Sequence, residues 1–210
     1  MSGRCLIISG GDFDQTFYTQ NTHEFDYVIA CDKGYEYAVR YGITPDLVVG
    51  DFDSVSIEVD PKISVIRLPA AKDDTDTGYA ARWALEKGYD SITIICAMGG
   101  RFDHQWANIQ TLASIASQGA WAAMLSEDTI VHALCASSII LPARSNWSFS
   151  VFAFSDTCEG VTIEGAAYNT ADTILNNTYP IGESNEWSQD SAYVSCTSGI
   201  LLVIESRLPV

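Results

Sequence analysis

The stretch Leu47-Val48-Val49-Gly50-Asp51-Phe52-Asp53-Ser54 joins a short apolar run to two carboxylates. The apolar run followed by glycine predicts a short buried strand over 47–49. In an extended chain residues i and i+2 point to the same side, so we expect Asp51 and Asp53 to converge while Phe52 points into the protein. Two hard oxygen donors at the end of a strand suit Mg²⁺, although a turn with capping Asp and Ser side chains fits this stretch equally well.

The segments around this stretch alternate between strand and helix patterns. Further strands are predicted at 4–9, 27–31, 64–68, 91–96 and 122–126, and helices at 35–41, between the acidic run 72–76 and residue 87, and between the loop 98–104 and residue 117. This alternation predicts an α/β N-terminal domain with a mostly parallel, Rossmann-like sheet and helices on both faces. Such sheets bind ligands in the crevice beyond the carboxyl ends of their strands.

Charged side chains follow these strands and should meet at that edge of the sheet. They are Asp12, Asp32, Asp51, Asp53, Asp73, Asp76, Arg101 and Asp103. The run 72–76 has a structural interpretation as well, because Asp and Thr cap helix N-termini and acidic residues complement the helix dipole. Several carboxylates at one site would repel one another unless a cation lies among them.

The loop Gly99-Gly100-Arg101-Phe102-Asp103-His104 combines several groups suited to a phosphate ligand. Two glycines allow backbone amides to approach a ligand closely, although an ordinary tight turn would also use them. Arg101 can bind phosphate in a bidentate manner, and Asp103 can accept a hydrogen bond from a substrate amino group. His104 fits a general base or a structural hydrogen-bonding residue equally well.

The pattern changes near residue 129, beyond which we expect no helix. Strands are predicted at 129–135, 148–154, 193–197 and 200–205, separated by Gly, Asn and Pro. We therefore expect two domains, residues 1–141 and residues 142–210, of which the second is an all-β sandwich or barrel. The polar segment 182–187 ends in Trp187, which is suited to stacking on an aromatic ring or to packing beneath an exposed hairpin.

The composition excludes several classes of protein. With 11 basic and 27 acidic residues the formal charge is -16, which argues against a general nucleic-acid or anionic-membrane binder. The six cysteines form no Cys-x-x-Cys pair, so neither a zinc site nor a redox motif is indicated, and several lie in apolar runs typical of buried free thiols. No signal peptide or membrane span is recognisable, so we expect a cytoplasmic protein.

These motifs together resemble those of one family, the thiamine pyrophosphokinases, also called thiamine diphosphokinases. Their order and approximate spacing fit the family along nearly the whole chain. The segments that carry the resemblance are 30–34 (Ala-Cys-Asp-Lys-Gly), 42–46 (Gly-Ile-Thr-Pro-Asp), 50–54 (Gly-Asp-Phe-Asp-Ser), 72–76 (Lys-Asp-Asp-Thr-Asp), 99–104 with Asn108, and 184–186 (Ser-Asn-Glu).

The resemblance implies the reaction ATP + thiamine → AMP + thiamine diphosphate, with ATP as co-substrate and Mg²⁺ as cofactor. It also implies a catalytic α/β domain, a C-terminal β-sandwich for thiamine binding and dimerisation, and a homodimer with shared active sites. The catalytic residues it implies are Asp51, Asp53, Asp76 and Arg101, the first three as metal ligands. The ATP or phosphate site would use Asp32, Gly34, Lys72, Asp73, Gly99, Gly100 and Arg101, and the thiamine site would use Asp103, Ser184, Asn185 and Trp187.

Two other functions are compatible with an Asp-x-Asp pair. A different metal-dependent transferase, for example a nucleotide-sugar enzyme, would turn over without thiamine. A non-catalytic module that keeps the nucleotide or thiamine site would bind its ligand without turnover.

Overall fold

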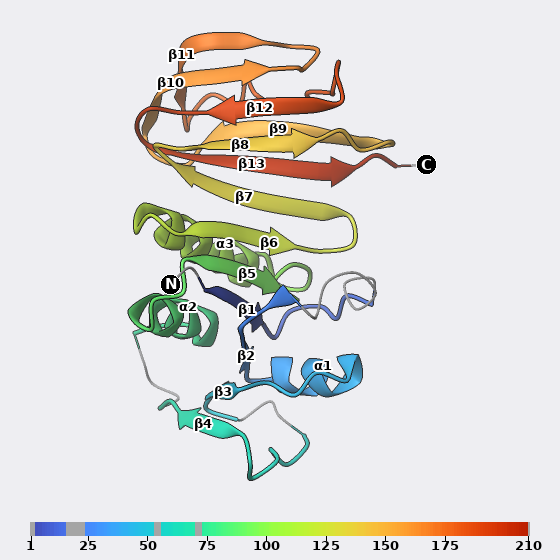
Figure 1. Ribbon diagram of the computed structural model, residues 1–210, viewed down its shortest axis with the longest axis vertical. Helices are drawn as coiled ribbons and strands as arrows, with labels where there is room; N and C mark the ends of the chain where they lie inside the picture. The colour runs from blue at the N-terminus through green and yellow to red at the C-terminus, as the bar shows by residue number, and fades with distance from the viewer. Residues whose placement is uncertain (1–2, 16–23, 53–55, 70–72, 210) are drawn as a thin grey trace.

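The computed structural model describes residues 3–15, 24–52, 56–69 and 73–209. These ranges form an elongated molecule with an α/β region at one end and a layered β region at the other (Figure 1). The helices are α1 (Gly34–Tyr41), α2 (Asp76–Glu86) and α3 (Phe102–Ser117).

A nine-stranded sheet runs through most of the molecule. Its strand order is β4-β3-β2-β1-β5-β6-β7-β13-β9, and pairing is parallel from β4 to β6 and antiparallel from β6 to β9. The order reverses direction beside β1, which places the topological switch point between β1 and β5. The strands are β1 (Arg4–Ile8), β2 (Tyr27–Cys31), β3 (Leu47–Gly50), β4 (Ser64–Arg67), β5 (Ser91–Ile95), β6 (Trp121–Leu125), β7 (Thr129–Cys135), β9 (Trp147–Ala153) and β13 (Ile200–Arg207).

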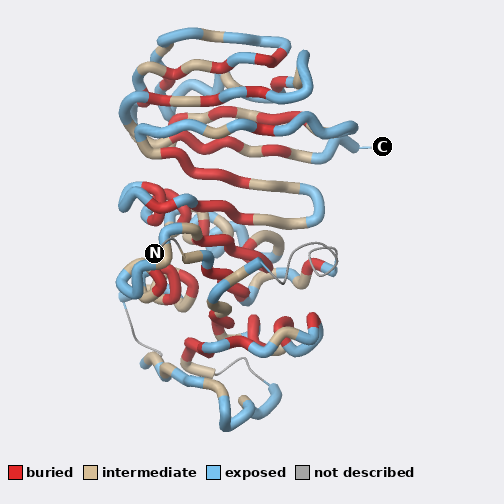
Figure 2. The backbone as a smooth tube through the Cα atoms, in the orientation of Figure 1, coloured by how far each residue is buried: buried red, intermediate tan, exposed pale blue. Residues whose placement is uncertain are grey.

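Alternating apolar side chains of the parallel strands are buried on both faces of this sheet. In β1, Cys5 and Ile7 face the side covered by α2 and α3, whereas Leu6 and Ile8 face the side covered by α1. Helix α1 ends where expected: Gly42 adopts φ 69° and its N–H donates to the carbonyl oxygen of Val39. The buried segments of Figure 2 accordingly run along the central strands.

A four-stranded antiparallel sheet packs on the far end of the large one. Its order is β11-β10-β12-β8, with β8 (Ser138–Pro142), β10 (Thr157–Glu164), β11 (Thr170–Asn176) and β12 (Ser191–Ser195). Phe149, Val151 and Val203 of the large sheet and Val161 and Val194 of the small one share one hydrophobic core, so the two sheets form a sandwich.

The structure confirms the predicted fold class, and it adds strands that the sequence pattern did not reveal. Strands β8, β10 and β11 were not predicted. Strands β9 and β13, expected in a separate β domain, continue the N-terminal sheet through β7. The proposed boundary between residues 141 and 142 falls within β8, so the two-domain division stays a prediction. Within the described ranges, no helix has the length and apolarity needed to cross a bilayer.

All six cysteines are free thiols, and five of them are buried. Burial, and then the charge of Asp46, raises the pKa of Cys5 from 9.0 to about 12; burial raises that of Cys158 to about 11. In the native protein the thiols of Cys5 and Cys158 therefore stay neutral at a pH at which unfolded thiols ionise, so their stabilising effect is complete below about pH 9 and is lost between there and about pH 11–12.

We expect the free energy of unfolding to fall above pH 9, with Cys5 contributing up to about 1.4 kcal/mol per pH unit. Thermal melting at pH 8 and pH 10 measures this loss. The variant C5A should lose less stability on alkalinisation than the wild type, whereas C135A, which removes a partly exposed thiol, should behave as the wild type does. Equal losses in all three proteins would contradict the assignment to Cys5.

Candidate active site

A pocket of about 610 Å³ lies beyond the carboxyl ends of the central parallel strands. Residues that follow β1, β2, β3 and β5 meet there with the first turns of α2 and α3, at the switch point where such sheets bind ligands. The lining residues are Ser9, Gly10, Gly11, Cys31, Asp32, Asp51, Thr75, Asp76, Thr77, Ala97, Gly99, Gly100, Arg101, His104, Ala107 and Asn108.

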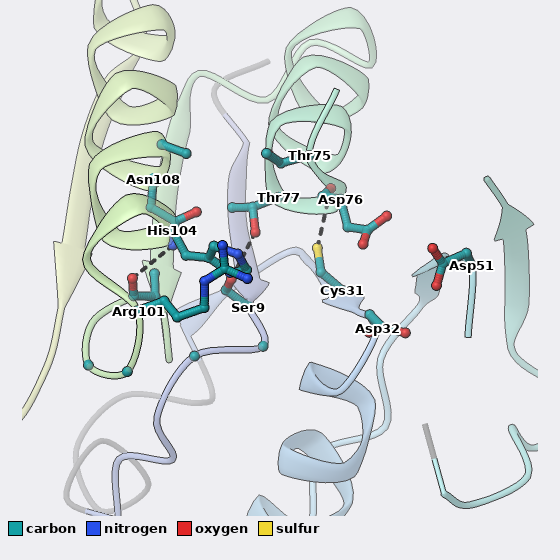
Figure 3. Close-up of a pocket in the computed structure, with 16 residues that line it drawn as sticks. Ser9, Cys31, Asp32, Asp51, Thr75, Asp76, Thr77, Arg101, His104 and Asn108 are labelled. Carbon is teal, nitrogen blue, oxygen red and sulfur yellow. Dashed lines mark hydrogen bonds between the residues drawn. The ribbon is translucent and has the colours of Figure 1, made fainter. Parts of the chain in front are cut away.

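One side of the pocket is acidic. Asp32 follows β2, Asp51 follows β3, and Asp76 is the first residue of α2, so three separate elements supply the carboxylates. In Figure 3 the carboxylates of Asp51 and Asp76 face each other, with Asp32 beside them. Asp32 reaches this position through a left-handed backbone with φ 48°, which is uncommon for a residue other than glycine and typical of functional sites.

These carboxylates fit a magnesium ion that also binds a substrate. No three His, Cys, Asp or Glu side chains lie close enough to hold a metal by themselves in the described part of the chain, from which Asp53 is missing. Mg²⁺ in proteins is typically held by one or two carboxylates together with substrate phosphates and water. The facing pair Asp51 and Asp76 supplies the hard oxygen donors that such a site needs.

The opposite side of the pocket carries Arg101. Its guanidinium makes two hydrogen bonds to the carboxylate of Asp103, one of them 3.1 Å from Nε to Oδ1. Both side chains are exposed, and the hydrogen bond from Arg101 lowers the pKa of Asp103. Arg101 lines the pocket, whereas Asp103 is not among its lining residues. Arg101 was predicted to bind ATP and Asp103 to bind thiamine. In this structure the two side chains therefore pair with each other instead.

The two glycines of this loop have different surroundings. Gly99 has φ 83° and Gly100 has φ 65°, a region that other residues rarely adopt. A Cβ atom on Gly99 would lie 2.2 Å from Oδ2 of Asp12, whereas one on Gly100 would have only Asp12 Oδ1 nearby, at 3.6 Å. Gly99 is thus required by close packing against Asp12, and Gly100 leaves space at the pocket.

Several residues predicted for the site do not line this pocket, and two others fall outside the residues that the structure describes. Asp53 and Lys72 fall outside the described residues, and the exposed Asp73 borders a separate groove between α2 and α3. Gly34 is a packing residue at the start of α1, where a Cβ atom would lie 2.1 Å from the carbonyl oxygen of Ile8. The expectation of an extended chain through Phe52 is wrong, because this residue has φ 67°. Its ring nevertheless packs against the core as expected.

Ser9, Cys31 and Thr77 line the pocket but were not predicted as site residues. Ser9 directly follows β1, and Cys31 is the last residue of β2. The rule that ligands bind at the carboxyl ends of strands could therefore have identified both residues. Thr77 carries no such signal. Asn108 is buried, and its Nδ2 donates to the carbonyl oxygen of Ala97 at 2.8 Å, which fixes α3 against the loop after β5.

The predicted thiamine residues of the C-terminal half lie away from this pocket. Asn185 is buried, and its side-chain amide accepts a hydrogen bond from the N–H of Tyr168 and donates one to the carbonyl oxygen of the same residue. Trp187 Nε1 donates to the carbonyl oxygen of Leu141 at 3.0 Å. Ser184 is exposed. All three belong to the connection between β11 and β12, in the upper part of Figure 1, whereas β1, β2 and β3 lie in the lower part. One chain therefore does not bring them to the acidic pocket.

Two family models match the chain in the same order as its two halves. Residues 18–122 match the thiamin pyrophosphokinase catalytic domain, and residues 139–201 match the thiamin pyrophosphokinase vitamin B1 binding domain. The acidic pocket belongs mainly to the first match and the β11–β12 connection to the second.

Individual proteins agree with the family models. Thiamine pyrophosphokinase of Bacillus subtilis is 30% identical over 212 residues, covering 95% of this chain and 97% of the relative. A crystal structure of thiamine pyrophosphokinase from the same species superposes with a TM-score of 0.86 at 28% identity, covering 97% of this chain and 99% of that one. The enzyme from Geobacillus thermodenitrificans gives a TM-score of 0.82 at 26% identity, with 97% of both chains covered.

Proposed function

Because this chain belongs to the thiamine pyrophosphokinase family, we propose that the acidic pocket beyond β1, β2, β3 and β5 is where it carries out the family's reaction. The chain transfers the diphosphate of ATP to the hydroxyl of thiamine and releases AMP and thiamine diphosphate. The observation that supports the pocket as the site is the convergence of Asp32, Asp51 and Asp76 opposite Arg101 at the switch point of the sheet.

Transfer of a diphosphate depends on positioning and charge neutralisation more than on covalent help from the protein. We propose that Asp51 and Asp76, together with Asp53, hold Mg²⁺, with Asp32 and Lys72 supporting the phosphate cluster. Bound Mg²⁺ supplies positive charge for the triphosphate, which the acidic pocket would otherwise repel. Arg101 holds the phosphates from the opposite side through its planar pair of donors. The thiamine hydroxyl attacks the β-phosphorus, and AMP leaves.

The product assay tests the reaction directly. Purified protein is incubated with ATP, Mg²⁺ and thiamine, AMP is measured by a coupled assay, and thiamine diphosphate is identified by its mass. AMP that appears only when thiamine is present supports the assignment. Binding of thiamine without any AMP would instead favour a non-catalytic module, and turnover of a nucleotide sugar without thiamine would favour the other transferase class.

We propose further that thiamine is bound between two copies of the chain in a homodimer. Asp103 of one copy holds the aminopyrimidine, and Ser184, Asn185 and Trp187 of the other form the wall of the thiamine site. The separation of these residues within one chain supports the need for a second copy. An apolar surface at β11 suits the contact, since large side chains are exposed on this strand and on the connections before and after it: Tyr168, Ile174, Tyr179 and Ile181.

Subunit mixing tests this arrangement. D76N damages one half of the shared site, and S184R blocks the other with bulk and with a positive charge that repels the thiazolium. Each variant alone should have very low activity. Co-expression should restore about a quarter of wild-type activity, the statistical fraction of intact sites in a twofold-symmetric dimer. Activity that stays at the sum of the separate variants would contradict a shared site.

The remaining proposals concern organisation and location. Residues 1–141 would form the nucleotide- and Mg²⁺-binding part, and residues 142–210 the thiamine-binding and dimerising part. The cytoplasmic location stays a prediction, supported by the six free thiols, which are typical of a reducing compartment.

A further inference from the structure

The first turn of α2 carries three consecutive side chains with different contacts. Thr75 caps the helix, since its Oγ1 accepts a hydrogen bond from the N–H of Gly78 at 2.9 Å. Asp76 reaches into the acidic pocket. Thr77 faces β1, where its Oγ1 lies 2.8 Å from Oγ of Ser9, and both hydroxyl-bearing residues are only 5% exposed (Figure 3).

A second contact fixes the same turn to the neighbouring strand. Cys31 is the last residue of β2, and its Sγ donates to the carbonyl oxygen of Asp76 at 3.6 Å. Asp76 is therefore fixed to β2 through its own carbonyl group and to β1 through the residue that follows it.

The fully buried side chains of α2 beyond its first turn supply close packing without direction, and its ring contact, Trp83 on Tyr27 of β2, lies towards the other end of the helix. Its buried face consists largely of Ala80, Ala81 and Ala84, whose methyl groups let the helix approach the sheet closely. Apolar contact between small side chains is non-directional, so it sets the distance of the helix from the sheet more firmly than its rotation or its position along its axis. Hydrogen bonds depend on distance and angle, and these two lie at the end of the helix that carries Asp76.

We infer that Ser9, Thr77 and Cys31 are positioning residues that set the place of Asp76 opposite Asp51. The inference rests on the proposed role of Asp76 as a Mg²⁺ ligand. The two carboxylates belong to different elements, and the contacts of Ser9 and Cys31 connect the helix to two strands of the sheet that also holds β3. The spacing of the carboxylates thus depends on this hydroxyl pair and this thiol.

Removing the hydroxyl pair should weaken metal binding while the protein stays folded. In T77V the side chain keeps its shape but loses its hydrogen bond, and Ser9 is left with a buried, unpaired hydroxyl. Loss of a residue that orients a metal ligand typically lowers metal affinity or activity by about 10–100-fold. We expect this loss in the affinity for Mn²⁺, used as a paramagnetic substitute for Mg²⁺, and in kcat, with a smaller change in the KM for thiamine.

The experiment measures Mn²⁺ binding by electron paramagnetic resonance and turnover by AMP release, both well below the melting temperature. T77S restores a hydroxyl and should recover most of the affinity. S9A should match T77V, and the double variant should be no worse than either, because both substitutions break one bond. C31A should show a loss in the same direction. T111V is the matched control, since Thr111 donates its hydroxyl to the carbonyl oxygen of Ala107 within α3.

Two results would overturn the inference: T77V and S9A bind Mn²⁺ as tightly as T111V does, or T77S binds no better than T77V. A purely structural role would lower the melting temperature without changing Mn²⁺ affinity in the folded protein. Should T77V lose its melting transition, S9A and C31A test the same contacts from the strands. D76N separates this inference from the proposed function: if D76N keeps its Mn²⁺ affinity, the metal assignment fails, whereas loss in D76N alone refutes only the positioning role.

Discussion

Replacing Asp76 or Asp51 with asparagine should reduce turnover by about 10²–10³-fold or more, at least the size of effect seen when one preorganised hydrogen-bond donor is removed from an active site. Asparagine keeps the shape of the side chain and removes the charge that the proposed Mg²⁺ site requires. The two carboxylates face each other in the pocket, so each substitution removes one of a pair. Steady-state AMP release at increasing Mg²⁺ concentration measures the loss, and the Mg²⁺ concentration for half-maximal activity should rise.

Asp74 offers a matched control two residues before Asp76. Its carboxylate pairs with Arg82 and borders the separate groove between α2 and α3. D74N should therefore keep near-wild-type turnover and an unchanged Mg²⁺ dependence. All three variants should melt cooperatively, because the substituted side chains are not part of the hydrophobic core. Near-wild-type rates in both D51N and D76N would contradict the assignment of these carboxylates to the metal.

Replacing Arg101 with alanine should lower kcat/KM for ATP by about 10²–10³-fold, because the guanidinium is the proposed phosphate-binding group opposite the carboxylates. R101K keeps the charge but loses the planar pair of donors, so it should recover only part of the rate. The loss should appear chiefly when ATP is varied. The exposed pair between Arg101 and Asp103 stabilises the fold little, and the melting temperature should hardly change.

The control for Arg101 is Arg82, another exposed arginine paired with an aspartate close to the start of a helix. R82A should leave the kinetics of ATP unchanged. If R101A loses no more activity than R82A does, Arg101 does not bind the transferred phosphates, and the proposed charge balance of the pocket has to be assigned to other groups.

The local pattern of the sequence was sufficient for the α/β half of the fold. Strands β1, β2, β3 and β5 were predicted almost to their ends, because each is a short apolar run. In the first three, a Gly or Asp also lies within two residues of the end of the run. The carboxyl ends of parallel strands share one edge of a sheet, so the position of the acidic residues followed from the strands alone. Only side chains at that edge, Asp32, Asp51 and Asp76 among them, could be assigned in this way.

The β half was less predictable, since its strands lack clear alternation. In β11, for example, Leu175 is the one buried residue, and β10 carries a glycine in its interior. Such strands are recognisable mainly from the partners that they pair with, and pairing between β13 and β7 spans a long stretch of chain. For this reason β9 and β13 were expected in a separate domain, although they extend the large sheet.

The sequence by itself determined the family, the class of fold and the acidic edge of the sheet, because short motifs and periodicity are local properties of the chain. Only the tertiary structure decided which groups meet. It separated Ser184 from the pocket, paired Arg101 with Asp103, and joined Ser9 to Thr77 across 68 positions of sequence. Contacts of this kind depend on how a helix rests on a sheet, and side-chain packing in three dimensions sets that arrangement.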